Sequence, residues 1–273
     1  EEKLVEEKSS IEDEVKDYDG LLAKAEEEYK QKSEEIEKIN ETLGGLRAIA
    51  YKTIALRGLN KFDEANELIN FPKLVKKFYG QDLIYEDILE FNKKFRDSLL
   101  IDPRRKTEEN PGGWAIRGGT VIRELFKDKG NPLILRFSKM LSEAIKRYIK
   151  DLPINSNHPF LMRKIHKFNI DNCWVNFLKS GDFQSNHIHN NADLSGVYYL
   201  DEVQVEDERL NAGWIEFNRS GYSLPHYGGE KEIKLIKPEV GMFILFPSYV
   251  WHGTIPYTSS YTRGSISFDI TIQ

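Results

Sequence analysis

The sequence contains almost no cysteine, no long apolar segment and no excess of basic charge. Cys173 is the sole cysteine among 273 residues, which excludes an internal disulfide framework and a CxxC metal or redox site. No run of 18 or more apolar residues occurs, so no membrane span is predicted. Residues 1–45 hold 16 acidic and 7 basic side chains, and the other 228 residues carry a net charge of only +4, unlike a basic nucleic-acid-binding surface. We therefore expect a soluble, cytoplasmic protein that binds neither nucleic acid nor membrane.

The length and the change in residue pattern along the chain predict a helical arm and a main domain. A length of 273 residues is just under two domains at about 150 residues each, and 40% hydrophobic residues can form a sizeable core. We assign residues 1–70 to a helical arm and residues 71–273 to the main domain. Within that domain, residues 71–152 are expected to give helical support and residues 153–273 the β-core.

The arm is expected to begin with a long charged helix over residues 11–46. Positions three and four residues apart form one stripe, and Glu and Lys fill the other faces, a pattern typical of a coiled coil or of a helix packed along one side. Gly44 and Gly45 interrupt this helix, and residues 46–70 resemble a single tetratricopeptide-like helical hairpin. The stripe favours a solvated stalk or a packing helix, and the alternative is a helix-mediated homodimer or a protein partner bound through residues 1–70.

The rest of the chain changes from helices to strands. Amphipathic segments at 84–99 and 133–149 predict helices, and the glycine-rich link at 110–114 lacks the Gly-Lys-Ser/Thr of a phosphate-binding loop. After residue 153, short segments rich in β-branched and aromatic residues recur between turn signals, which predicts an antiparallel barrel or sandwich. The expected strands are 173–178, 194–200, 213–217, 232–236, 242–246 and 265–272. The fold class is therefore α+β, with a jelly-roll or cupin-like core and supporting helices.

Three histidines are the strongest candidates for chemistry. His187 and His189 precede a predicted strand, and residues two apart on an extended chain point to the same side. His252 follows a second buried strand and a proline-led turn. Two ligands at one strand end and a third from a distant strand form the layout of a facial metal triad, and its open positions suit iron that binds substrate and dioxygen.

A cation eleven residues after His252 adds a second element to this pattern. Arg263 and Ser265 open the last predicted strand and share a face. A guanidinium and a hydroxyl in a barrel interior fit a buried carboxylate, because charge-assisted bonds offset its desolvation. An exposed arginine paired with a nearby acidic residue is the alternative for Arg263 taken alone. Residues 201–211 and 220–230 flank the expected opening.

The order of these motifs resembles the Fe(II)/2-oxoglutarate-dependent oxygenases. The resemblance rests on His187-x-His189, Ser195-Gly-Val-Tyr-Tyr, Pro247-x(4)-His252 and Arg263-x-Ser265, and is closest to the bacterial and phage branch marked by HxH and SGxYY. It covers roughly residues 72–273. The same residues also fit a cupin signature, with Gly181 before the first two histidines and Gly241 before the third.

The resemblance implies a double-stranded β-helix that binds Fe(II), 2-oxoglutarate and dioxygen. His187 and His252 match the two histidines of the family's triad, and Arg263, Ser265 and Tyr199 match positions that bind 2-oxoglutarate. The family's acidic ligand falls at His189, so either three histidines bind the iron or Asp193 replaces His189. We prefer His189 because of its two-residue spacing.

The implied function is a hydroxylase that couples decarboxylation of 2-oxoglutarate to C–H hydroxylation of a small-molecule or protein substrate. Two alternatives come from other readings of the same sequence. One is a cupin-type iron dioxygenase that uses no 2-oxoglutarate and would not need Arg263 and Ser265. The other is a non-catalytic helical scaffold that binds partners through residues 1–70.

Overall fold

The computed structural model describes residues 45–84, 87–107, 115–155, 157–162, 165–202, 211–256 and 259–273, together with positions 20, 23, 24, 27 and 30. The charged helix predicted over residues 11–46 therefore lies almost entirely outside the described residues. No helix in the described part of the chain is long and apolar enough to cross a membrane.

The helices begin and end where capping residues and glycines dictate. Helix α6 begins at Ile88, later than the predicted residue 84, because the Asp87 side chain accepts hydrogen bonds from the backbone N–H groups of Leu89 and Glu90. Asn131 caps α7 in the same way, and Pro132 occupies its first turn. The helices are α2 (Leu46–Gly58), α3 (Phe62–Ile69), α4 (Phe71–Leu74), α5 (Gly80–Leu83), α6 (Ile88–Leu100) and α7 (Pro132–Lys150), with 3-10 helices η1 (Leu125–Lys127) and η3 (Gly229–Glu232).

The strands follow the predicted order, with additional short strands before residue 153 and two more, at 183–184 and 252–254, that were not predicted. The segment from 71 to 152 was predicted as helices and a link, yet it also contributes strands to the main sheet. The strands are β1 (Lys76–Tyr79), β2 (Lys106–Thr107), β3 (Ile116–Arg117), β4 (Thr120–Ile122), β5 (Phe168–Leu178), β6 (Phe183–Gln184), β7 (Leu194–Tyr199), β8 (Ile215–Phe217), β9 (Lys234–Ile236), β10 (Met242–Pro247), β11 (His252–Thr254) and β12 (Arg263–Ile272).

From β7 onward the chain crosses repeatedly between a large and a small sheet, which makes the core a double-stranded β-helix. Within the described residues, the large sheet has the order β1-β10-β7-β12-β5-β4-β2. The small sheet has the order β11-β8-β9, and an antiparallel bridge between His187 and His252 connects it to the segment that follows β6. The chain thus crosses between these sheets from β7 to β8, from β9 to β10, from β10 to β11 and from β11 to β12, as expected for a jelly roll.

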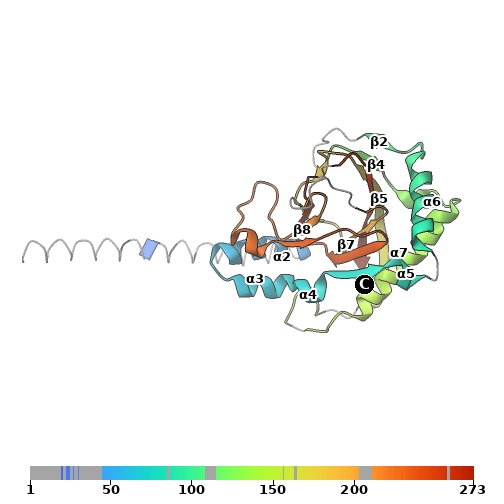
Figure 1. Cartoon of the computed structure of the whole chain (residues 1–273). Coiled ribbons are helices and arrows are strands. Elements are labelled where there is room, and N and C mark those ends of the chain that lie inside the picture. The colour runs from blue at the N-terminus through green and yellow to red at the C-terminus, as the bar shows by residue number, and fades with distance from the viewer. Residues whose placement is uncertain are drawn as a thin grey trace, which may run out of the picture.

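The large sheet presents one face to the helices and the other to an interior cavity. On β7, Tyr198 points outward, where its hydroxyl donates to Asn92 of α6 and its ring contacts Phe137 of α7. Its neighbour Tyr199 lines the cavity, as the two-residue period of a strand requires. Helices α5, α6 and α7 lie along the outside of the barrel (Figure 1). The helices therefore close one side of the core and leave the inner face for chemistry.

The helical hairpin α2–α3 packs directly against the barrel. Ile49, Ala50 and Ile69 belong to the same hydrophobic core as the strands. The indole N–H of Trp251 donates to the carbonyl of Ala50, and the buried Arg57 donates to the carbonyl of Asn218. A helical hairpin over residues 46–70 is thus present, while its repeat character and the predicted domain boundary at residue 70 stay predictions.

Candidate metal centre

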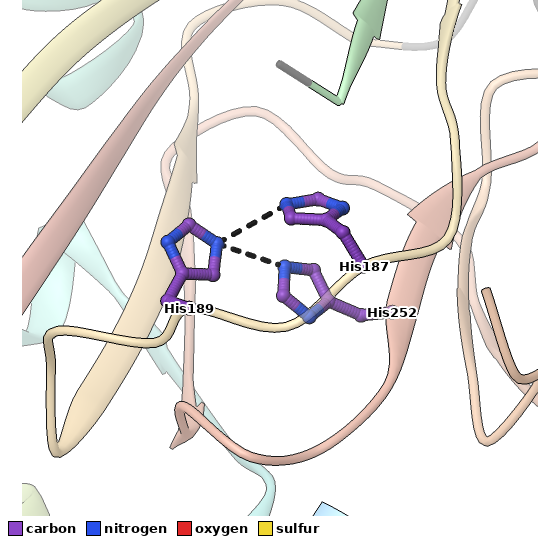
Figure 2. A group of neighbouring side chains, drawn as sticks. All are labelled: His187, His189 and His252. Carbon is purple, nitrogen blue, oxygen red and sulfur yellow. Dashed lines mark hydrogen bonds between the residues drawn. The ribbon is translucent and has the colours of Figure 1, made fainter. Parts of the chain in front are cut away.

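Three histidine rings meet at the open end of the barrel. The Nε2 atom of His189 lies 3.2 Å from Nε2 of His187 and 3.3 Å from Nε2 of His252 (Figure 2). Among the described residues, these three side chains form a group in which one ring nitrogen from each histidine lies within 4.8 Å of the other two. The structure therefore brings together all three of the histidines that the sequence singled out.

The backbone places these rings by pairing segments that lie far apart in the sequence. His187 and His252 exchange two backbone hydrogen bonds, with N···O distances of 2.9 and 3.1 Å, so they face each other across two antiparallel segments. The backbone N–H of His189 donates to the carbonyl of Ser248 in the turn after β10. The turn between β10 and β11 thus fixes both the third ring and the segment that carries the first two.

Each ring is oriented by an acceptor at its other nitrogen. Nδ1 of His187 lies 2.8 Å from the carbonyl oxygen of Ser185, and Nδ1 of His252 lies 2.9 Å from that of Val250. Nδ1 of His189 lies 2.9 Å from a carboxylate oxygen of Asp269. Because each acceptor requires a proton on Nδ1, each Nε2 carries a lone pair directed at the same point.

This donor set fits a divalent metal ion. Burial, with a smaller contribution from His189, lowers the pKa of His187 to about 3, and burial lowers the pKa of His252 well below its usual value. Both rings are therefore neutral at neutral pH, the form that binds metals. Three lone pairs that converge within 4.8 Å repel one another unless a cation lies between them. Three imidazoles suit iron, zinc, copper or nickel.

The three rings open onto a cavity of about 860 Å³ that is lined by both sheets. Trp174 on β5 forms part of the wall, with its ring stacked on His189 at a centroid distance of 5.9 Å. Residues 220–223, within a segment predicted to flank the opening, also line the cavity. Of the other flanking segment, residues 203–210 lie outside the described residues.

The predicted carboxylate-binding residues line the same cavity. Arg263 is 2% exposed, donates a hydrogen bond to the carbonyl of Gly213, and lies with its guanidinium carbon 5.7 Å from the centre of the Tyr199 ring. Ser265 is directly opposite Tyr199 in the β12–β7 pairing. Burial raises the pKa of Tyr199 to about 12, so its hydroxyl stays protonated and can donate to an anion. A buried cation with two hydroxyl donors beside it is suited to a carboxylate.

Asp193, the alternative to His189, is placed differently from the three histidines. One of its carboxylate oxygens accepts a hydrogen bond of 2.9 Å from the backbone N–H of Ile272 on β12. Its own backbone N–H donates to Ile270, and its carbonyl accepts from Ser248. Asp193 thus ties β7 to β12 and to the turn after β10, and it is absent from the histidine group.

Three residues that the sequence reasoning missed also belong to the site. Ser267 and Asp269 line the cavity, and Ser195 donates a hydrogen bond to Asp269. The sequence pattern that could have identified Ser267 and Asp269 is the two-residue period of β12, which places every second residue after Arg263 on the same inner face. The same period on β5 places Asn176 in the cavity, where its amide donates to Ser267.

A family model matches the part of the chain that forms this site. Residues 172–269 match the family described as "Putative 2OG-Fe(II) oxygenase". The match begins on β5 and ends at Asp269 on β12, so it contains all three histidines together with Arg263 and Ser265. No curated protein matches the sequence.

Solved structures of similar shape are also found. A Pseudomonas putida prolyl-4-hydroxylase is 14% identical with a TM-score of 0.48, over 76% of this chain and 98% of that one. A Trichoplax adhaerens prolyl hydroxylase, in complex with a hypoxia inducible factor peptide fragment, is 16% identical with a TM-score of 0.49, over 78% and 92%. HygX from Streptomyces hygroscopicus, with nickel and 2-oxoglutarate bound, is 10% identical with a TM-score of 0.47, over 76% and 86%.

Proposed function

We propose that this protein is a hydroxylase that uses Fe(II), 2-oxoglutarate and dioxygen, because residues 172–269 match the family model described as "Putative 2OG-Fe(II) oxygenase". The observation that carries the proposal is the convergence of three Nε2 lone pairs in the same cavity as a buried arginine. Iron with bound 2-oxoglutarate supplies the oxidising chemistry, and the protein supplies orientation and a dry site.

His187, His189 and His252 are the residues that would hold the metal. Their Nδ1–H groups are already engaged by two carbonyls and a carboxylate, so little reorganisation is needed before Nε2 binds an ion. Trp174 covers one side of His189 and limits access of water to that ring. Three protein ligands leave coordination positions for a co-substrate and dioxygen.

Arg263, Ser265 and Tyr199 would bind the distal carboxylate of 2-oxoglutarate. The guanidinium can offer two parallel N–H donors to a carboxylate, a geometry that Lys lacks. Tyr199 offers a protonated hydroxyl from the neighbouring strand. The co-substrate would then extend from this end of the cavity toward the histidines.

The decisive experiment measures succinate formed by protein that has been reconstituted anaerobically with Fe(II) and then given 2-oxoglutarate and oxygen. We expect wild-type protein to form succinate, and His187→Ala and His252→Ala each to abolish it. His166→Ala is the matched control, because His166 is exposed and its backbone N–H bonds to Gln273, away from the site. Wild-type protein that binds no Fe(II) under these conditions would refute the proposal.

A second candidate function is an iron dioxygenase that uses no 2-oxoglutarate. The observation that favours it is the donor set, since three imidazole nitrogens can bind iron without any help from Arg263. The same reconstituted protein discriminates the two functions. Oxygen consumption that is independent of 2-oxoglutarate and unchanged in Arg263→Lys would support this second function.

The proposal also covers the N-terminal arm, the binding partners and the cellular location of the protein. We infer that the stripe of residues 11–46 forms a coiled coil and that residues 1–70 bind a second copy of the chain or another protein. The substrate is a small molecule or a peptide that enters the cavity beside residues 220–223. The sole cysteine, Cys173, is buried as a free thiol, which is compatible with a reducing, cytoplasmic location.

A further inference from the structure

Asp269 lies on the inner face of β12, six residues after Arg263. Together with Ser265 and Ser267, these residues occupy every second position of the strand, and all four line the cavity. At about 3.3 Å per residue, the strand spans about 20 Å from Arg263 to Asp269. The arginine and the aspartate therefore lie at opposite ends of one row, and the aspartate is at the end nearer the histidines.

Two contacts fix the Asp269 carboxylate. One of its oxygens lies 2.9 Å from Nδ1 of His189 and accepts a 2.8 Å hydrogen bond from the hydroxyl of Ser195. Ser195 is directly opposite Asp269 in the β7–β12 pairing, so both residues are set by sheet register. Asp269 is only 9% exposed, which leaves little solvent to screen its interaction with the imidazole.

This carboxylate distinguishes His189 from the other two rings. His187 and His252 are oriented by the neutral carbonyls of Ser185 and Val250. Three neutral imidazoles would leave a bound dication with its full charge. A carboxylate behind one imidazole increases the electron density on that ring and lowers the net charge of the assembly.

We propose that Asp269 is a positioning residue with two effects on the metal centre. Its carboxylate orients His189 so that Nε2 binds the metal, and its negative charge partly offsets the positive charge of the bound metal. The inference rests on the proposed function, because it assumes that the three histidines bind iron. Outer-shell partners of metal-binding histidines contribute about tenfold to a hundredfold to metal affinity. Asp269 is expected to contribute within that range.

The test compares Asp269→Asn with Asp193→Asn. The first substitution removes the charge behind His189 at nearly constant volume. The second removes a nearby carboxylate that accepts a hydrogen bond from the backbone of Ile272 instead. Affinities for Fe(II) under anaerobic conditions and for Co(II) are measured by competition with a chelator. We expect Asp269→Asn to bind both metals about tenfold to a hundredfold more weakly, and Asp193→Asn to stay within about twofold of wild type.

Two spectroscopic readouts separate this role from a purely structural one. At saturating metal, the visible absorption of bound Co(II) should change in Asp269→Asn, because the donor strength of His189 falls. The reduction potential of bound iron should rise, because the removed anion favours Fe(III) over Fe(II). Neither quantity should change in Asp193→Asn.

Ser195→Ala keeps the inference testable if Asp269→Asn does not fold. This variant retains the carboxylate and removes one donor that holds it, so metal affinity should fall by roughly twofold to fivefold. Wild-type protein that binds neither Fe(II) nor Co(II) would refute the proposed function. If wild-type protein binds both metals but Asp269→Asn leaves affinity, spectrum and potential unchanged, only the role of Asp269 is overturned. If Asp269→Asn does not fold, an unchanged metal affinity in Ser195→Ala overturns that role instead.

Discussion

Replacing Arg263 with lysine is the sharpest test of the co-substrate site. The substitution retains a positive charge but loses the planar fork, which in wild type donates to the carbonyl of Gly213 and faces the Tyr199 ring. An ammonium cannot keep the bond to Gly213 and also offer two parallel donors to a carboxylate. The variant should therefore lose about one charge-assisted hydrogen bond to 2-oxoglutarate.

The expected size follows from that single bond. A hydrogen bond to a charged group contributes about 1.5–3 kcal/mol. Since about 1.4 kcal/mol corresponds to a factor of ten, the dissociation constant for 2-oxoglutarate should rise about tenfold to 150-fold. The metal affinity should stay unchanged, because Arg263 lies about 20 Å along β12 from Asp269, the residue that contacts His189.

The assay is isothermal titration calorimetry of 2-oxoglutarate into Ni(II)-loaded protein. Nickel binds imidazole sites more tightly than Fe(II) and keeps the site filled without turnover. Arg96→Lys is the matched control, because Arg96 donates to Asp201 and to the carbonyl of Thr262 and does not line the main cavity. An unchanged dissociation constant in Arg263→Lys, with nickel fully bound, would refute the placement of the carboxylate at Arg263.

Three further predictions follow from other contacts. Tyr199→Phe removes a neutral donor and should raise the dissociation constant for 2-oxoglutarate by roughly threefold to tenfold in the same calorimetric assay, and no change would remove Tyr199 from the site. Gly196→Ala would place a methyl group against the Phe268 ring and 2.6 Å from the carbonyl oxygen of Ile244, so denaturant titration should show a loss of about 1–3 kcal/mol in the free energy of unfolding. The pKa of His158 is lowered by burial, so the unfolded chain binds a proton that the folded chain does not, and folding stability should fall as the pH drops below about 6.5. His158→Asn retains an acceptor for the N–H of Phe160 and should reduce this pH dependence in thermal melts, and the remainder comes from buried His187 and His252.

The strands that carry chemistry were predictable because strict two-residue periods and turn residues determine them. The spacing of His187 and His189, and of Arg263 and Ser265, correctly indicated side chains that share one face. The meeting of His252 with His187 could not be derived from local pattern, because it depends on pairing between segments 65 residues apart. The resemblance to a known family supplied that long-range information.

The short strands and the packing of the hairpin were less accessible from the sequence. Lys76–Tyr79 lies within a segment that reads as helical, and it forms an edge strand only because β10 offers it a partner. The hairpin α2–α3 resembles an independent unit by period, yet its apolar face is buried against Trp251 and the strands. Tertiary contacts determine both the strand at Lys76–Tyr79 and the packing of the hairpin, and local residue propensity does not predict tertiary contacts.

The choice between His189 and Asp193 illustrates the same limit on a smaller scale. Both residues lie within a short polar turn, and a carboxylate is the more familiar third ligand for iron in such a triad. The register of β12 decides the geometry, because Asp193 bonds to the backbone of Ile272 while Asp269 reaches His189. The carboxylate that contacts a histidine of this group thus comes from the last strand.

The last strand therefore connects the two halves of the site. A slip of one residue in β12 would turn Arg263, Ser265 and Asp269 away from the cavity together. That register is fixed by pairing with β7 on one side and β5 on the other, and the pairing with β5 shifts directly after Asp269. Bulges of this kind bend a strand and commonly lie next to active sites. The pairing with β5 is regular from Arg263 to Asp269, so the residues proposed for co-substrate binding and for orienting His189 depend on one strand register.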